Sequence, residues 1–450
     1  MTTQEERAIP VVRLRDLHPT LRLRLAIAFV ERMLNTMVIP VMAIYLSAEL
    51  GAATAGLLIL TSVGVAVVAG LSSGHFADVF GRRRALLAGA VTMTVGFGGM
   101  TLAVSPAWSA PLAVFAFYLV QMAAASFVQP VHDAVIIDLT VPAERKVVYA
   151  LNYWTFNIAL AAGALLAGFL YNGHLVGMLG GAAAAALVAA LLTYRFLDES
   201  APPSARLGRG GGSAGEVVRD YLAVFRDRRF MMLLGAMTLI LGLEMQRTSG
   251  YVAVHVAQDV PTQGLLPFGT WLPAVNGIQL VGLIHAANTV CVALLALSSE
   301  RILRRVADRA RIVVGVGIFT VACAVLATSD LAWVLLLAVL VLSIGELLHI
   351  PVMETVLAGA VPDHARAKYM AIFNLNVRGG LVIASVSLGL GAVVPPWGMA
   401  GTYLLLGLAA TLLYLALLTP RRAPAADGGT PERPEGDRRD RTRGGAAPVA

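Results

Sequence analysis

The sequence predicts an all-α membrane protein with twelve transmembrane helices and with both termini in the cytoplasm. Three observations lead to this prediction: the composition, the number of long apolar runs, and the alternation of positive charge between those runs. Of the 450 residues, 58% are hydrophobic and only 14% are charged, and the mean hydropathy is +0.75. A soluble domain carries far more charge on its surface, so the composition indicates a bilayer.

Twelve apolar runs approach or exceed the roughly 20 residues that a membrane-spanning helix needs. Gly, Pro or charged residues separate each run from the next, as expected where a helix ends. The end of the seventh run is the least sharply marked. The runs cover residues 21–46, 54–76, 84–105, 111–138, 148–171, 174–196, 229–254, 278–298, 311–328, 331–357, 369–394 and 397–418.

Positive charge alternates between the connections. All but three of the 34 Lys and Arg residues lie in the N-terminal arm, in the C-terminal tail, in the loops that follow the even-numbered helices, or within a few residues of these segments. The loops after the odd-numbered helices contain no Lys or Arg. Positive loops stay in the cytoplasm, so both termini are predicted to lie there. The protein itself is predicted to lie in the cell (inner) membrane. The formal net charge of +7 is therefore a topology signal and does not predict a nucleic-acid partner.

The chain divides into two halves. We expect a cytoplasmic arm at 1–20, a six-helix bundle at 21–196, a cytoplasmic linker at 197–228, a second bundle at 229–420, and a disordered tail at 421–450. The linker contains Pro202-Pro203 and a glycine-rich stretch, and the tail is rich in Pro, Gly, Arg and Asp.

The halves also resemble each other in sequence. Pro130-Val131-His132-Asp133-Ala134-Val135 in the first half corresponds to Pro351-Val352-Met353-Glu354-Thr355-Val356 in the second, and each stretch is followed by Val-Pro, Arg and Tyr. Such parallel repeats build the two halves of a transporter around a central site. The repeat makes Asp133 and Glu354 pseudo-symmetric acids on the fourth and tenth helices.

The most specific short segment connects the second and third helices. Here Gly74 and Gly81 allow close helix approach and a tight turn, Asp78 stands at the end of one helix, and Arg82-Arg83-Arg84 begin the next. A carboxylate in that place can pair with Arg or cap a helix N-terminus and so hold the cytoplasmic side closed. The alternative is a plain positive cytoplasmic loop.

This segment resembles the signature loop of the major facilitator superfamily, and the twelve helices, the linker and the repeat agree with that family. Further stretches resemble LmrP-type proton/multidrug antiporters: Leu21-Arg22-Leu23-Arg24-Leu25, Ile136-Ile137-Asp138, Glu144-Arg145-Lys146-Val147-Val148, Tyr153-Trp154 and Ile344-Gly345-Glu346. The resemblance implies that Asp78 is a conformational-switch acid, that Asp138 is linked to protonation, and that Glu346 is the cavity carboxylate for lipophilic cations. Asn152 stands where that group has another acid, and its acid on helix 7 has no clear counterpart here.

Charged side chains inside the apolar runs cost at least about 2.5–3.5 kcal/mol each at the bilayer centre, so each requires a partner or a function. Glu31 and Arg32 lie near the middle of the first run. Adjacent helical positions do not face each other, so we expect the two to have different partners. Glu31 either faces a substrate cavity or forms a structural pair, and Arg32 can neutralise an acid on another helix.

Two more groups of ionisable residues lie in the second half. Glu346 is near the middle of the tenth run, and His349 follows one turn later on the same face. A carboxylate there attracts cations and binds protons, or it accepts a structural hydrogen bond. Glu244 and Arg247 are three residues apart on the seventh helix and can form a local ion pair.

The remaining candidates lie on the eleventh and fifth helices. Arg378 has no acid close to it in sequence, and we predict that it reaches Glu354 on the tenth helix. Tyr153, Trp154 and Phe156 line a lipophilic pocket or serve as packing and interface residues.

The sequence therefore predicts a secondary transporter that exports lipophilic cations in exchange for protons. No cofactor is expected, and the two cysteines, Cys291 and Cys323, indicate neither a disulfide nor a metal site. No P-loop, zinc-protease motif or nucleophile elbow suggests an enzyme. We expect a monomer in the lipid bilayer that binds protons and a small molecule. The alternatives are a carrier for a defined metabolite such as a sugar, peptide or organic anion, and a membrane sensor or scaffold that has the transporter fold but does not transport.

The predicted roles fall into four sets. We expect proton coupling at Asp133, Asp138, Glu346 and Glu354, and substrate binding at Glu31, Asn152, Trp154 and Glu346. The predicted conformational gate is Gly74, Asp78, Gly81, Arg82, Arg83 and Arg84, and the intramembrane charge partners are Arg32, Glu244, Arg247 and Arg378.

Overall fold

The computed structural model describes residues 19–140, 142–199, 222, 224–267, 273–303, 306–362 and 365–418. Most of the predicted arm (1–20), most of the predicted linker (197–228) and the predicted tail (421–450) lie outside the described residues. Within the described residues the only strands are a short antiparallel pair, β1 (Gln263–Gly264) and β2 (Ala274–Val275). The prediction of an all-α membrane protein is confirmed.

The N-terminal bundle consists of α1 (Pro19–Leu50), α2 (Ala52–Phe80), α3 (Arg82–Val104), α4 (Pro111–Asp138) and α5 (Pro142–Phe196). Single glycines at positive φ, Gly51 (82°) and Gly81 (93°), separate α1, α2 and α3, because only glycine adopts this conformation without strain. Within α5 the backbone leaves the helical region at Asn172–His174. The two arms on either side of this kink are the predicted fifth and sixth helices.

The C-terminal bundle consists of α7 (Arg228–Glu244), η3 (Met245–Arg247), α8 (Tyr251–Asp259), α9 (Gly277–Leu303), α10 (Asp308–Leu326), α11 (Ala332–Ala360), α12 (Arg366–Phe373), α13 (Leu375–Leu390) and α14 (Pro396–Leu418). Two predicted helices are interrupted here. The run at 229–254 is not one continuous helix, since η3 and a turn divide α7 from α8. The run at 369–394 is divided into α12 and α13.

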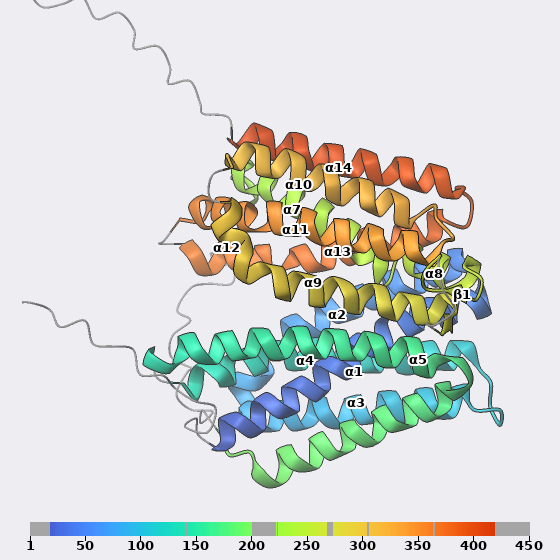
Figure 1. Ribbon diagram of the computed structural model, residues 1–450. Helices are drawn as coiled ribbons and strands as arrows, with labels where there is room; N and C mark the ends of the chain where they lie inside the picture. Colours follow the sequence, from blue (N-terminus) through green and yellow to red (C-terminus); the bar gives the residue numbers. More distant parts are fainter. Residues whose placement is uncertain are drawn as a thin grey trace, which may run out of the picture.

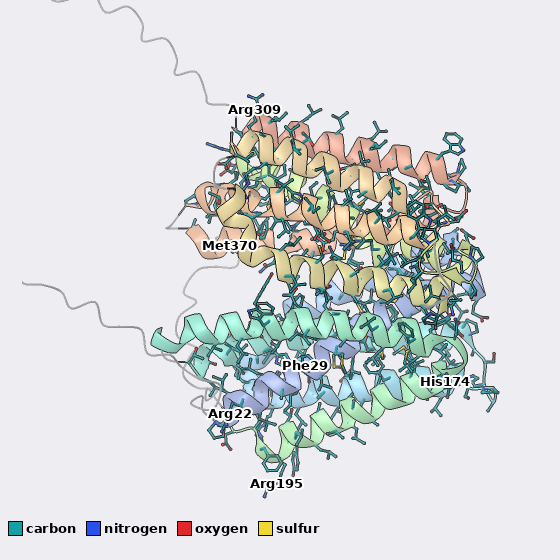
Figure 2. All side chains as sticks on the ribbon, in the orientation of Figure 1. Arg22, Phe29, His174, Arg195, Arg309 and Met370 are labelled. Carbon is teal, nitrogen blue, oxygen red and sulfur yellow. The ribbon has the colours of Figure 1, made fainter. Side chains whose placement is uncertain are left out.

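Ten helices of the described chain are long and apolar enough to cross a membrane, counting α5 once and α7 to α8 as one span. Separating the two arms of α5 and adding the shorter apolar α13 brings the spans to the predicted twelve. α1 begins and α14 ends at the same end of the molecule (Figure 1). Arg22, Arg195 and Arg309 lie at that end, and His174 lies at the opposite end (Figure 2). The charge pattern makes the arginine-bearing end cytoplasmic.

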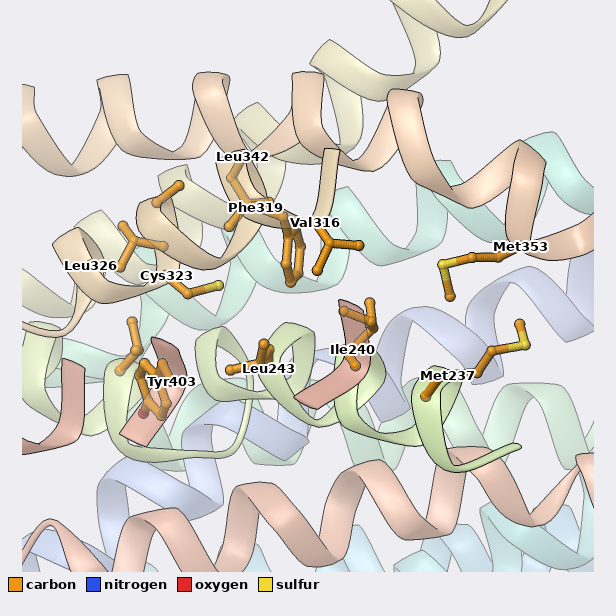
Figure 3. Packing of buried hydrophobic residues seen from close by; sticks show 14 of the residues in the cluster. Met237, Ile240, Leu243, Val316, Phe319, Cys323, Leu326, Leu342, Met353 and Tyr403 are labelled. Carbon is orange, nitrogen blue, oxygen red and sulfur yellow. The ribbon is translucent and has the colours of Figure 1, made fainter. Parts of the chain in front are cut away.

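Each bundle has its own apolar core. In the C-terminal bundle Leu243, Phe319 and Tyr403 are completely or almost completely buried and converge between the helices (Figure 3). The bundles touch each other where α2 packs on α13 and α5 packs on α9. Their cytoplasmic ends diverge, and their outer ends meet near α8 and β1 (Figure 1).

Glycines allow the helices of the two bundles to approach each other closely. A Cβ atom on Gly56 of α2 would lie 2.7 Å from the carbonyl oxygen of Ser385 in α13, and one on Gly282 of α9 would lie 2.6 Å from that of Ala164 in α5. Gly56 follows the outer end of α1 by only a few residues, and Gly282 lies close to the outer start of α9. The protein is therefore closed at its outer end in this conformation.

Candidate transport site

A buried ion pair lies in the C-terminal bundle. Glu346 of α11 is 5% exposed, and its Oε1 lies 3.2 Å from Nη2 of Arg247, which is 2% exposed. Its other oxygen, Oε2, accepts a hydrogen bond of 2.9 Å from Asn288 of α9, which also donates to Ser343. Residues of two other elements, η3 and α9, thus hold the buried carboxylate of α11, where an uncompensated charge is costly.

The break between α7 and α8 positions Arg247. Gln246 supplies the hydrogen bonds that the interrupted helix lacks: its Nε2 donates to the Gly242 carbonyl, and its Oε1 accepts from the Tyr251 backbone N–H and the Tyr403 hydroxyl. Interrupted helices at membrane depth occur where protein or a cavity satisfies the freed backbone, and they mark ion and substrate sites in transporters. Here the buried amide fixes the turn that carries the arginine.

Arg247 also lies close to a second carboxylate. Glu244 Oε1 is 3.9 Å from the same Nη2 atom that contacts Glu346, and the Glu244 side chain is 41% exposed. The Nε and Nη1 atoms of Arg247 have no hydrogen-bond partner among the described residues. His349, predicted on the face of Glu346, contacts the Gly345 carbonyl through Nδ1 and packs edge-on against Phe319, which is a packing arrangement.

The N-terminal bundle contains a second buried cluster. Glu31 of α1 is 4% exposed, and its Oε2 lies 2.5 Å from Nε2 of His132 on α4. Arg24 lies two turns before Glu31 on the same face of α1 and is 1% exposed. Its Nη2 contacts the His132 ring and lies 3.7 Å from Glu31 Oε2. The adjacent Arg32 points elsewhere: its Nη1 donates to Asn152 Oδ1 at 2.7 Å, and its guanidinium lies over the Phe156 ring.

The signature loop forms a network within the N-terminal bundle. Arg82 Nε lies 3.3 Å from Asp138 Oδ2 at the end of α4, and Arg82 Nη2 lies 3.7 Å from Asp78 Oδ1. The backbone N–H groups of Arg82 and Arg83 donate to the carboxylate of Glu199, at 2.7 Å and 3.2 Å. Glu199 thus caps the N-terminus of α3, where a carboxylate is favoured.

Gly81 makes this cap possible. Its φ is 93°, and a Cβ atom there would lie 2.4 Å from Glu199 Oε2. At Gly74, by contrast, an added Cβ atom would meet no atom of the described residues within 4 Å, and Arg84 is exposed. Sequence analysis missed Glu199; the only signal was an acid directly after the sixth apolar run. The loop therefore joins the ends of α2, α3, α4 and α5 on the cytoplasmic side.

Several predicted site residues are not brought together. The predicted pairing of Arg378 with Glu354 is wrong in this conformation, because the two form no ion pair in the described structure. Arg378 is the side chain nearest a Cβ built on Gly70 of α2, at 3.9 Å. Glu354 is exposed on α11. Asp133 is exposed on α4 and interacts with Arg32.

The remaining polar residues complete the described site. Trp154 is 43% exposed on α5. Gln121 of α4 donates to Asn35 of α1, a contact between helices that sequence analysis did not identify. Asn288 and Ser343 were likewise not assigned roles, because uncharged polar residues scattered in apolar runs give no signal until their partners are known.

The comparisons with known proteins identify the family. The family model of the Major Facilitator Superfamily matches residues 25–278 and 268–447. The chain belongs to the major facilitator superfamily. It is accordingly a secondary transporter of the cell membrane, and its relatives are transporters, not enzymes.

Two relatives span most of this superfamily member. A Na(+), Li(+), K(+)/H(+) antiporter of Planococcus maritimus is 27% identical over 414 residues, covering 89% of this chain and 95% of the relative. The uncharacterized MFS-type transporter YqjV of Bacillus subtilis (strain 168) is 24% identical over 381 residues, covering 82% of this chain and 85% of the relative. The finer resemblance to LmrP-type multidrug antiporters stays a prediction.

Solved structures share the fold. The nucleoside transporter NupG is 17% identical with a TM-score of 0.66, covering 88% of this chain and 99% of that chain. The peptide transporter POT in complex with sulfate is 15% identical with a TM-score of 0.66, covering 89% of this chain and 93% of that chain. At these identities the likeness concerns the fold and not the substrate.

Proposed function

We propose that this transporter exchanges protons for a cation, with Glu346 as the carboxylate that binds either one. The observation that carries the proposal is the burial of Glu346 against Arg247 and Asn288. A carboxylate in such a place holds one positive partner at a time, because two cations and one anion leave a net charge in a low-dielectric site. Proton and substrate cation therefore displace each other, and a gradient of one drives movement of the other.

Arg247 is the internal cation that yields to the substrate. When a cation approaches Glu346, the guanidinium must leave, and Glu244 lies 3.9 Å from the same Nη2 atom. This transfer moves charge within the break between α7 and α8, where the short 3₁₀ turn η3 interrupts the α-helical hydrogen-bond pattern. Because α8 packs against α1 of the other bundle, a shift at the break reaches the interface between the bundles.

The class of cation follows from two further observations. The relative that is 27% identical is named for exchange of Na(+), Li(+) and K(+) against H(+), which favours a monovalent metal cation here. The exposed aromatic residues Tyr153, Trp154 and Phe156 on α5 favour the second candidate, a lipophilic organic cation. Aromatic faces attract cations, by about 0.5–2 kcal/mol per contact.

The cytoplasmic loop network serves as the inner gate in this proposal. In the present conformation the network of Asp78, Arg82, Asp138 and Glu199 stays within the N-terminal bundle. Closure of the cytoplasmic side brings this loop against the other bundle, while the glycine contacts at the outer end separate. Alternating access then exposes Glu346 to one side of the membrane at a time.

Proton release from the purified full-length protein tests the proposal. Na⁺, K⁺ or tetraphenylphosphonium is added to weakly buffered protein in detergent, and the pH is followed for the wild type, Glu346→Gln and Glu49→Gln. Glu49 is an exposed acid near the outer end of α1 and is the matched control. We expect release with at least one cation, lost in Glu346→Gln and retained in Glu49→Gln.

The opposite result has an equally clear meaning. No release with any of the three cations, or equal release from Glu346→Gln, contradicts exchange at this carboxylate. Release or uptake of protons on adding organic anions would instead favour the metabolite carrier, since two guanidinium nitrogens of Arg247 have no hydrogen-bond partner within the described part of the chain.

A further inference from the structure

We propose that the Glu31–His132 pair of the N-terminal bundle is a second proton-binding site, discharged in the same transport cycle as Glu346. The inference rests on the proposed proton–cation exchange and adds to it the number of protons that each cation displaces. It assigns to His132 a role as proton acceptor in the bundle that does not contain Glu346.

The geometry of the cluster suits a shared proton. Nε2 of His132 and Oε2 of Glu31 are 2.5 Å apart, which is a hydrogen-bond contact, and both side chains are at least nine-tenths buried. A proton that arrives on the imidazole gives an imidazolium that donates to the carboxylate. A proton that arrives on the carboxylate gives a neutral acid that donates to the imidazole. In either case one proton is added and no other bond changes.

A cavity connects this pair to other polar groups. It is lined from α1 by Glu31, Arg32 and Asn35, from α4 by Gln129 and His132, and otherwise by apolar side chains. Gln129 and its neighbour Asp133 are exposed, and Gln129 Nε2 contacts Asp133 Oδ1 at 3.4 Å. Polar residues thus extend from an exposed surface of α4 to the buried imidazole, which gives water and protons a route.

The charges around the pair explain why a proton there would be exchangeable. In the described structure the charged groups that face it are Arg24 and Arg32 of α1 and Asp133 of α4, while α3 contributes the apolar Met93 and α5 the neutral Asn152. Arg24 already balances Glu31, and its Nη2 also contacts the His132 ring. Among the described residues, the Nε and Nη1 atoms of Arg24 have no hydrogen-bond partner. An added proton leaves an excess positive charge, so occupancy responds to a change in the position of either arginine.

Movement of α1 would change the positions of both arginines. This helix carries Arg24, Glu31 and Arg32, and it packs against α8 of the other bundle, next to the break that holds Arg247. Rocking of the bundles therefore moves both acidic sites relative to solvent. Glu346 and the Glu31–His132 pair become loaded and discharged in the same cycle.

The consequence is a net movement of charge. Exchange of a single proton for a monovalent cation is electroneutral, whereas a second proton makes every cycle electrogenic. The membrane potential then adds to the driving force of every cycle. A transporter with both sites can export a cation against a larger gradient than one with Glu346 alone.

The test compares current with proton flux in proteoliposomes of the full-length protein. Vesicles that contain a pH dye are adsorbed on a solid-supported membrane and exposed to a Na⁺ jump, and charge movement and dye response are recorded together. The variants are His132→Gln and Glu31→Gln. The matched control is His349→Gln, a buried histidine in a packing contact.

For the wild type we expect both a current and a dye response. His132→Gln and Glu31→Gln should halve the protons moved per cation and abolish the sustained current, while Na⁺-driven proton flux persists. His349→Gln should keep the wild-type ratio. A role in folding alone would lower current and flux together and would not change their ratio.

Each contrary result has a distinct meaning. If the wild type moves no protons against any cation, the proposed function is contradicted, and the second site is contradicted with it. A wild type that exchanges without current, or variants with an unchanged ratio, overturns only the second site. If both variants are inactive, infrared difference spectra between acidic and neutral buffer give the answer. The spectrum of Glu346→Gln should contain a titrating signal that the spectrum of His132→Gln lacks. If Glu346→Gln has no such signal, the inference is rejected.

Discussion

Removal of the buried pair between Arg247 and Glu346 gives the sharpest test of the energetics. The two side chains are 1% and 6% exposed and are joined at 3.2 Å. Arg247→Met alone leaves a buried carboxylate without its cation, and Glu346→Leu alone leaves a buried guanidinium, so each should cost about 3–5 kcal/mol of unfolding free energy. The double variant leaves neither charge. Asn288 then loses one acceptor and keeps Ser343, so the pair of changes should cost about 1–3 kcal/mol.

Equilibrium unfolding in mixed detergent micelles measures these differences, with tryptophan fluorescence as the signal. Glu244→Gln serves as the control, because this acid is 41% exposed and 3.9 Å from Arg247. It should cost less than about 1 kcal/mol. Additive costs of the two single variants, with the double variant the least stable, would refute the assignment of a coupled buried pair.

Three further predictions follow from particular contacts. Gly81→Ala should lower the melting temperature and slow transport, since the backbone conformation there (φ 93°, ψ 154°) costs an L-residue about 1–3 kcal/mol and the new Cβ meets the capping carboxylate. Gly74→Ala, where a Cβ meets no described atom within 4 Å, should behave as wild type. Gly282→Val should force α9 from α5 and expose the outer end, seen as faster labelling of an engineered outer cysteine by an impermeant thiol reagent; unchanged labelling would argue against that closure. Asn152→Ala should lower the free energy of unfolding by about 1.5–3 kcal/mol, because the 2.7 Å hydrogen bond from Arg32 is lost. Asn152→Asp should keep an acceptor for Arg32 and so keep the stability; equal melting temperatures of the two variants would contradict this.

The membrane made much of the fold predictable. Backbone groups in a bilayer must be satisfied within the helix, so each span leaves an apolar run bounded by charge or glycine. The arginines of the even-numbered connections likewise indicated the orientation, because charge crosses the membrane at high cost. The interruption of the seventh helix was not predictable. It depends on Gln246, whose side chain bonds Tyr251 and Tyr403, and a glutamine in an apolar run gives no sign of that tertiary role.

The site was predictable only in its charged members. Glu346 and Arg247 were identified because ionisable residues in apolar runs are rare and costly. Their pairing with each other was not predicted, since it depends on how η3 and α11 face each other. The sequence likewise does not specify how each helix is rotated about its axis, which is why the predicted pairing of Arg378 with Glu354 was wrong. The cap from Glu199 was missed because it joins segments more than a hundred residues apart.

The central claim is that a cation and a proton compete for Glu346, and exchange in sealed vesicles tests it most directly. Proteoliposomes of the wild type and of Glu346→Gln, loaded with a pH dye, are exposed to outward and inward gradients of Na⁺ at fixed pH. The account predicts that Na⁺ entry raises the internal pH of wild-type vesicles and that Na⁺ exit lowers it. Glu346→Gln vesicles should show neither change. Equal pH changes in both, or Na⁺ uptake by the wild type with no pH change, would contradict it.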